Sequence, residues 1–129
     1  MDETPRSEEF AALGHSGSKH YAGLETFDNP GVTRVEMTSD ELVALGPVNE
    51  QPDMYTVTIE YAPALLCLES KSLKLYLTQY RNEEVFCEAL AVKIRNDVAA
   101  ALAIDASGVS VELTQKARGG ITITATAAG

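Results

Sequence analysis

The stretch "ESKSLKLYLTQYRN" (Glu69–Asn82) lies near the middle of the chain and decides how the rest can fold. Its large apolar residues fall at positions i, i+3, i+4 and i+7, which are Leu73, Tyr76, Leu77 and Tyr80. That spacing is typical of one face of a helix. The alternating leucines of the same stretch also permit a strand. We predict a helix, because the spacing continues to Tyr80 and because Ser70 or Ser72 can cap the start.

The next stretch, "EEVFCEALAVKIRNDVAAALA" (Glu83–Ala103), predicts a second helix. Its apolar stripe consists of Phe86, Leu90, Ile94, Val98 and Leu102. Cys87 is expected beside that stripe rather than at its centre. Gly108 follows and is expected to end the helix, because glycine readily adopts the backbone conformations that follow a helix.

Two alternating segments precede the helices and two follow them. In the clearest of these, "MYTVTIEYA" (Met54–Ala62), the aromatic and aliphatic side chains share one face, and the threonines and the glutamate share the other. The other predicted strands are "VTRVEMT" (32–38), "VSVELTQ" (109–115) and "ITITATA" (121–127), the last two joined by the turn "KARGG". The stretch "SDELVALGPVNEQPD" (Ser39–Asp53) is expected to form a short helical turn and then a loop broken by Pro47 and Pro52.

The order β-β-α-α-β-β predicts an α+β fold, an antiparallel four-stranded sheet with two helices on one face, in a single domain of residues 13–129. Residues 1–12 are expected to be a flexible acidic N-terminus, and His15 and His20 to lie in an exposed loop. Small polar residues on the other sheet face suit a water-lined interior: Thr56, Thr58, Thr122 and Thr124. Exposed sheet edges favour a ring oligomer formed by edge pairing.

Composition and charge restrict the partners. Ten Lys and Arg residues oppose 19 Asp and Glu residues, which gives a net charge of −9. Nucleic-acid binders need a basic surface to displace counterions from phosphate, so we expect a small-molecule partner and no nucleic acid. No apolar run approaches the ~20 residues of a membrane span. The N-terminus does not resemble a presequence, and two cysteines without metal-ligand spacing favour a reduced cytoplasmic compartment and no metal.

The segment "ESKSLKLY" (Glu69–Tyr76) resembles the signature of the 7-cyano-7-deazaguanine reductases, the QueF-type nitrile reductases of queuosine biosynthesis. The likeness extends to "LETFDNP", "QPD", "RN" followed by Phe-x-Glu, and "RGGI", and so to nearly the whole chain. It implies the tunnelling fold (T-fold) and a homo-oligomer built of pentameric rings, often stacked in pairs as a decamer. It also implies that NADPH reduces a nitrile to a primary amine through a covalent thioimide.

The resemblance is incomplete where the family carries its reactive groups. The family pattern C-P-x-x-G-Q-P-D corresponds to "GPVNEQPD", so Gly46 stands at the nucleophile position and Glu50 at the family's glycine. Glycine has no side chain, so no thioimide can form there. Cys87 stands where the family has histidine in Phe-His-Glu, and the glutamate that recognises the base edge is retained as Glu88.

By this resemblance, each candidate residue has an expected role. Substrate binding is assigned to Glu88, Glu69 and Ser70. The phosphates of NADPH are assigned to Lys71, Lys74 and Arg118; no Rossmann glycine motif supports the cofactor independently. Asp53 is the candidate proton donor or relay, and Cys87 a candidate nucleophile, although neighbouring carboxylates are expected to raise the pKa of its thiol.

These residues favour a divergent reductase-like protein that binds a 7-deazaguanine base. It would act on the nitrile with NADPH, or by altered chemistry because the usual cysteine is missing. The main alternative is a catalytically silent 7-deazaguanine or purine binder, or a partner subunit of an active enzyme. Amidine formation on the same heterocycle and a tunnelling-fold enzyme acting on pterins also remain open.

Overall fold

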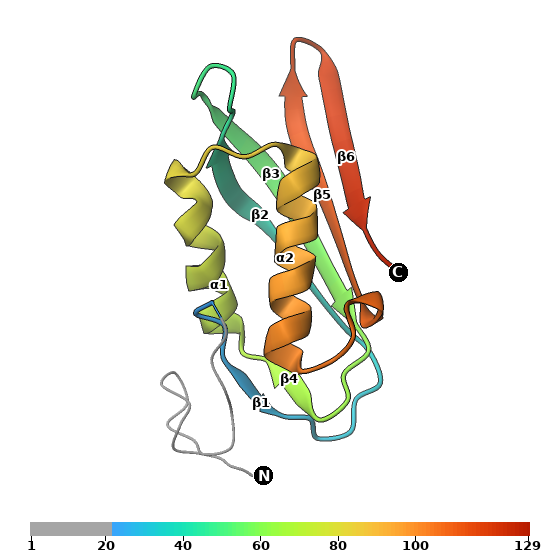
Figure 1. Cartoon of the computed structure of the whole chain (residues 1–129). Coiled ribbons are helices and arrows are strands. Elements are labelled where there is room, and N and C mark those ends of the chain that lie inside the picture. Colours follow the sequence, from blue (N-terminus) through green and yellow to red (C-terminus); the bar gives the residue numbers. More distant parts are fainter. Residues whose placement is uncertain (1–21) are drawn as a thin grey trace.

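The computed structural model describes residues 22–129, and the N-terminal segment with His15 and His20 lies outside them. The longer strands β2 (Val35–Leu45), β3 (Pro52–Tyr61), β5 (Val109–Arg118) and β6 (Ile121–Ala127) form an antiparallel sheet in the order β2-β3-β5-β6. The helices α1 (Ser70–Thr78) and α2 (Cys87–Leu102) lie on one face of this sheet (Figure 1). The predicted α+β arrangement of four strands and two helices is therefore confirmed.

The remaining elements are short. Two three-residue strands, β1 (Thr26–Asp28) and β4 (Leu66–Leu68), pair with each other in a separate antiparallel sheet that the sequence pattern did not reveal. The 3₁₀ helices η1 (Gln79–Asn82) and η2 (Ala106–Gly108) extend α1 and precede β5. In residues 22–129, α2 is the longest helix, and no helix has the length and apolar character needed to cross a bilayer.

Strand β3 supplies the centre of the core. Its inward-facing side chains are each at most 2 % exposed, namely Tyr55, Val57, Ile59 and Tyr61. The neighbouring strand β5 contributes Val109, Val111 and Leu113 to the same layer. Burial of each such side chain contributes about 1.5–3 kcal/mol to the stability of the fold. The alternation in the sequence therefore provides the apolar face against which the helices pack.

The prediction of a helical turn after Ser39 is wrong. Strand β2 continues to Leu45, and its second half pairs with β3 through Leu42 opposite Tyr55 and Ala44 opposite Asp53. The register shifts between Ser39 and Leu42, which marks a β-bulge. A bulge adds a residue to one strand and so interrupts the two-residue period by which the strand could have been predicted.

Helix α1 buries three of the four predicted residues, Leu73, Tyr76 and Leu77, while the fourth, Tyr80, is buried in η1. The cap of α1 differs from the prediction. Oε2 of Glu69 accepts a hydrogen bond from the backbone N–H of Lys71 (2.9 Å), and Oε1 accepts one from that of Ser72 (2.7 Å). Ser72 is instead buried inside the helix, where its hydroxyl accepts from the N–H of Glu25. A carboxylate satisfies two free amides at a helix start and favourably meets the helix dipole.

Helix α2 begins and ends differently from the prediction. Phe86 caps its start with extended backbone (φ −77°, ψ 150°) and is 58 % exposed, so it does not belong to the buried stripe. The other four stripe residues are buried as expected. The helix ends at Leu102, because Ala103 adopts the left-handed conformation (φ 57°) that terminates helices, and Gly108 lies in η2 instead.

A buried polar network joins the two helices. The hydroxyl of Tyr76 lies 2.6 Å from Oδ2 of Asp97, to which it donates, and 2.7 Å from the hydroxyl of Tyr80. The ammonium of Lys93 donates to the same Asp97 oxygen (2.9 Å) from the helix surface. Asp97 is only 7 % exposed, so it loses most of its hydration. The hydrogen bonds from Tyr76 and Lys93 compensate for that loss.

Candidate functional site

A cavity of about 240 Å³ opens where the β2–β3 turn, the start of α2 and the β5–β6 hairpin meet. We call it the Gly46 cavity. Backbone hydrogen bonds from Leu45 N to Glu83 O (2.9 Å) and from Val85 N to Leu45 O (3.1 Å) bring the end of β2 beside the segment that enters α2. The cavity is lined by Gly46, Pro47, Val48, Asn49, Asp53, Phe86, Cys87, Glu88, Gln115, Arg118 and Ile123.

The turn that forms one wall of this cavity is closed by its own backbone. The N–H of Gly46 donates to the carbonyl of Gln51 (2.9 Å), and the N–H of Glu50 donates to the carbonyl of Gly46 (2.8 Å). Glu50 adopts φ +58°, a left-handed conformation in which a side chain costs energy and glycine does not. Glu50, the position that the resemblance aligns with the family's glycine, therefore has a backbone conformation that favours glycine.

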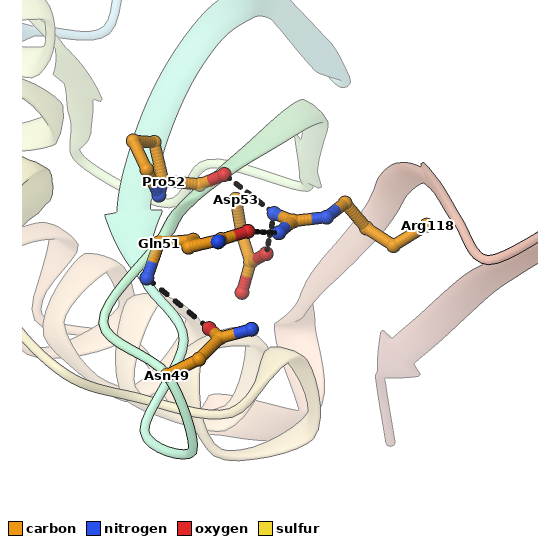
Figure 2. Close-up of polar contacts among 5 residues, drawn as sticks. All are labelled: Asn49, Gln51, Pro52, Asp53 and Arg118. Atoms are coloured by element: carbon orange, nitrogen blue, oxygen red, sulfur yellow. Dashed lines mark hydrogen bonds and ion pairs between the residues drawn. The ribbon is translucent and has the colours of Figure 1, made fainter.

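Arg118 holds the end of this turn in place (Figure 2). Its Nη1 donates to Oδ1 of Asp53 (2.9 Å) and to the carbonyl of Pro52 (2.8 Å), while Nη2 donates to the side-chain oxygen of Gln51. A guanidinium can make these contacts together because its donors form a rigid planar fork. Arg118, expected at the phosphates of NADPH, is thus directed at Asp53 in the Gly46 cavity.

Cys87 is the first residue of α2 and lies in the core cluster, only 2 % exposed, rather than beside the core as predicted. Burial raises the pKa of its thiol to about 11, and the negative charge of Glu88 adds to the rise. A helix N-terminus usually lowers a thiol pKa, but here the loss of hydration outweighs it. The thiol is therefore almost fully protonated at pH 7 and is a poor nucleophile.

Tyr55 is a member of this region that the sequence analysis did not single out for function. Its hydroxyl is buried and has no hydrogen-bond partner among the described residues. Burial is the main cause that raises its pKa, followed by the charges of Cys87, Asp53 and Glu88, so these groups lie close to it. Because alternate strand residues share a face, the spacing of Tyr55 two residues after Asp53 could have suggested this placement.

Glu88 follows Cys87 in the first turn of α2 and is exposed at the wall of the Gly46 cavity. Its charge is stabilised there by the positive end of the helix dipole. Four of the predicted site residues are therefore brought together around this cavity, namely Asp53, Cys87, Glu88 and Arg118.

The other predicted residues belong to a separate region on α1. Ser70 and Lys74 line a second cavity of about 290 Å³ between α1 and β2, which we call the α1 cavity. Its wall also carries Thr78 and Arg81, which the sequence analysis missed. Lys71 is exposed on α1, and Glu69 commits both carboxylate oxygens to the helix start.

Both cysteines are free and buried, and residues 22–129 contain no group of three or more His, Cys, Asp or Glu side chains arranged to hold a metal ion.

The chain is similar to known proteins over most of its length. The family model of QueF-like proteins matches residues 52–128. The NADPH-dependent 7-cyano-7-deazaguanine reductase of Chlorobium phaeovibrioides is 38% identical over 107 residues, which cover 81% of this chain and 90% of the relative. The reductase of the same name from Frankia casuarinae is 40% identical over 114 residues, which cover 88% of this chain and 90% of the relative.

A solved structure agrees with the fold. The apo archaeosine synthase QueF-Like matches with a TM-score of 0.67 at 23% identity, covering 75% of this chain and 93% of that one. At this identity the match concerns the fold alone. The family model and the curated relatives confirm the resemblance drawn from "ESKSLKLY": this chain belongs to the QueF-like family.

Proposed function

We propose that this chain binds a 7-deazaguanine base in the Gly46 cavity without attacking it covalently. The observation that carries the proposal is the convergence of Glu88, Asp53 and Gly46 on one cavity. In the expected pose, the carboxylate of Glu88 accepts hydrogen bonds from the N–H edge of the base, and the substituent at the 7-position lies over Gly46. Both bonds at Glu88 would be charge-assisted, which makes them stronger than neutral ones.

The arrangement of the reactive groups favours binding over nitrile reduction. Gly46 is buried and offers no side chain to the ligand. Cys87 lines the same cavity, but its raised pKa leaves almost no thiolate at neutral pH. Asp53 shares one oxygen with Arg118, so it is held as the partner of a cation. These three features leave a recognition site whose nucleophile is missing.

NADPH is the cofactor named for the curated relatives, and the α1 cavity has side chains that fit it. Lys74 and Arg81 supply positive charge and Ser70 supplies a hydroxyl donor for phosphate oxygens, against the single carboxylate of Glu41 on the same wall. The hydroxyl of Thr78 already donates to the backbone carbonyl of Lys74 (2.9 Å). When bound, NADPH would supply hydride. Lys71 would extend this basic surface along α1, whereas Arg118 would serve the Gly46 cavity.

A ring oligomer is part of the proposal. Strands β2 and β6 are the outer strands of the sheet, and outer strands present unpaired backbone groups to a neighbouring copy. Ile123 of β6 lines the Gly46 cavity together with Glu88, so a subunit paired with β6 would lie close to that cavity.

The test of the proposal follows binding and chemistry in the same samples. The full chain is titrated with 7-deazaguanine and 7-cyano-7-deazaguanine by calorimetry, then incubated with the cyano base and NADPH while nicotinamide absorbance and intact mass are recorded. We expect binding without NADPH oxidation and without a mass adduct. If neither base binds, the proposal is wrong.

A second candidate function is NADPH-dependent nitrile reduction with Cys87 as a relocated nucleophile. It is favoured by one observation, the presence of Cys87 on the wall of the Gly46 cavity. It predicts NADPH oxidation, the aminomethyl product and a covalent adduct that disappears in Cys87→Ala. Persistence of the adduct in that variant rules out the thiol.

A further inference from the structure

The helices cover one face of the sheet (Figure 1), and a cavity of about 460 Å³ lies on the other face, which we call the open-face cavity. On β3, Tyr55 and Val57 are buried on the helix side, so Met54 and Thr56 point to the opposite face. The volume is within the range of about 300–1,000 Å³ that small-molecule sites occupy. Among the described residues, only Gln115 lines both this cavity and the Gly46 cavity, so the two cavities are separate.

Two β-bulges place opposite charges on the two sides of the open-face cavity. The register shifts after Ser39 in β2 and after Gln115 in β5. Asp40 lies in the first bulge and Lys116 in the second, and both side chains line the cavity. A bulge leaves its extra residue outside the ladder and re-aims its side chain. Because β2 and β5 are the neighbours of β3 on either side, their backbones are about 10 Å apart.

Neither of these charges is neutralised by another described residue. No hydrogen bond or ion pair joins the side chain of Asp40 or Lys116 to the rest of residues 22–129. At the Gly46 cavity, by contrast, Arg118 is paired with Asp53 at 2.9 Å. Within the described part of the chain, Asp40 and Lys116 are also the only charged side chains on the walls of the open-face cavity. The cavity thus offers one unpaired carboxylate and one unpaired ammonium group.

The floor between the two charges is polar, with one apolar point. Thr56 of β3 pairs in register with Thr114 of β5, whose hydroxyl lies 3.2 Å from that of Thr124. The hydroxyls of Thr56 and Thr122 line the cavity and make no hydrogen bond within residues 22–129. Met54 is 51 % exposed although β3 is an inner strand of the sheet. Its flexible thioether side chain offers a contact for an apolar ligand group.

An α-amino acid matches these groups one by one. Its ammonium carries three donors and a positive charge for the carboxylate of Asp40. Its carboxylate accepts from the ammonium of Lys116, whose flexible four-carbon side chain can reach across part of the cavity, and from threonine hydroxyls. An apolar side chain would cover Met54. A polyol would leave both charges unmatched, and a simple anion or cation would match only one of them.

We infer that the open-face cavity binds an α-amino acid with an apolar side chain, with the ammonium at Asp40 and the carboxylate at Lys116. The site lies on the sheet face opposite the helices and does not depend on the binding of a base in the Gly46 cavity. The chain then has two ligand sites of different chemistry, one on each face of the sheet.

The test titrates the full chain by calorimetry with L-leucine as the probe amino acid and with three analogues. Leucinamide lacks the carboxylate, 4-methylpentanoate lacks the ammonium group, and glycine lacks the apolar side chain. We expect leucine to bind, and each singly charged analogue to bind at least ~10-fold more weakly, because each loses one charge-assisted contact. Glycine is also expected to bind more weakly, since Met54 stays uncovered. If leucine does not bind at millimolar concentration, or binds no more tightly than any one analogue, the inference is overturned.

Two variants assign the charges to their residues. Asp40→Asn is expected to weaken leucine about 10-fold and to leave 4-methylpentanoate unchanged, because that analogue has no ammonium group. Lys116→Gln is expected to weaken leucine similarly and to leave leucinamide unchanged. A loss of fold would instead weaken every ligand together. Glu36→Gln and Arg95→Gln make the same charge changes outside the cavity walls and should alter no affinity. An unchanged affinity for leucine in either cavity variant contradicts the inference.

Discussion

Polar groups between α1 and α2 and polar groups near the Gly46 cavity differ in how their hydrogen bonds are satisfied. Between the helices, Asp97 receives bonds from Tyr76 and Lys93, and the hydroxyls of Tyr76 and Tyr80 lie 2.7 Å apart. Near the cavity, the buried hydroxyl of Tyr55, which does not line it, has no partner among the described residues, and the lining residue Glu88 is exposed. An unpaired buried polar group costs free energy, so the hydroxyl of Tyr55 carries a cost that the network at Asp97 avoids.

Part of the wall of the Gly46 cavity is held by contacts that do not involve Gly46. Arg118 binds to the Gln51–Asp53 segment and keeps the cavity wall in shape even though Gly46 supplies no thiol. The turn keeps its left-handed residue at Glu50 as well. The shape of this wall therefore does not depend on a side chain at position 46.

The largest expected effect comes from Gly46→Cys, which places a thiol in the wall of the Gly46 cavity. Its Cβ would begin 3.1 Å from the Asp53 carboxylate, which can take up the thiol proton. We expect a covalent adduct with the cyano base by intact mass, and NADPH oxidation where the starting chain shows none. Gly46→Ser, of similar size but a weaker nucleophile, is the control; an adduct in the serine variant would contradict the assignment.

Glu88→Gln tests whether the exposed carboxylate of Glu88 accepts hydrogen bonds from the base. The amide places an NH₂ group where an acceptor is needed, and it removes the charge from both bonds. We expect affinity for 7-deazaguanine to fall by about 10–100-fold in calorimetry. Glu84→Gln is a matched change outside the cavity wall and should leave affinity unchanged. Equal affinities for both variants would show that Glu88 does not contact the base.

A pair of tyrosine variants compares the hydrogen-bonded hydroxyl of Tyr76 with the hydroxyl of Tyr55, which has no partner among the described residues. Tyr76→Phe removes the donor that lies 2.6 Å from Asp97 and should lower the free energy of unfolding by about 1–3 kcal/mol. Tyr55→Phe removes a buried hydroxyl without a partner among the described residues, so it should be neutral or slightly stabilising. Urea denaturation of both variants measures the difference. A loss for Tyr55→Phe as large as that for Tyr76→Phe would mean that the Tyr55 hydroxyl is satisfied.

The smallest effect is expected from Glu50→Gly in the turn beside the cavity. Glycine adopts φ +58° without the steric cost that a side chain adds, so the variant should gain about 0.5–1 kcal/mol in free energy of unfolding. Ala103→Gly, at φ 57° after α2, is the matched change and should show a similar gain. If Glu50→Gly is destabilising while Ala103→Gly is not, the Glu50 side chain supports the turn.

Local periodicity determined most of the fold from the sequence alone. The alternation at Tyr55–Tyr61 and the helical spacing from Leu73 to Tyr80 each place apolar side chains on one face, and burial of that face fixes the element type. The motif "ESKSLKLY" was sufficient to identify the family. The residues assigned to the base and the cofactor were also named from motifs, and their roles remain predictions.

Only the tertiary structure decided how the site is assembled. The bulge in β2 interrupts its alternation, so the first half was predicted as a strand and the second half, which leads to Gly46, was not. The contact of Arg118 with Asp53 joins residues 65 positions apart and depends on the pairing of β3 with β5. Likewise the burial that raises the Cys87 pKa comes from packing against distant elements, because the neighbours of a side chain in space, and not along the chain, set its hydration and its electrostatic field.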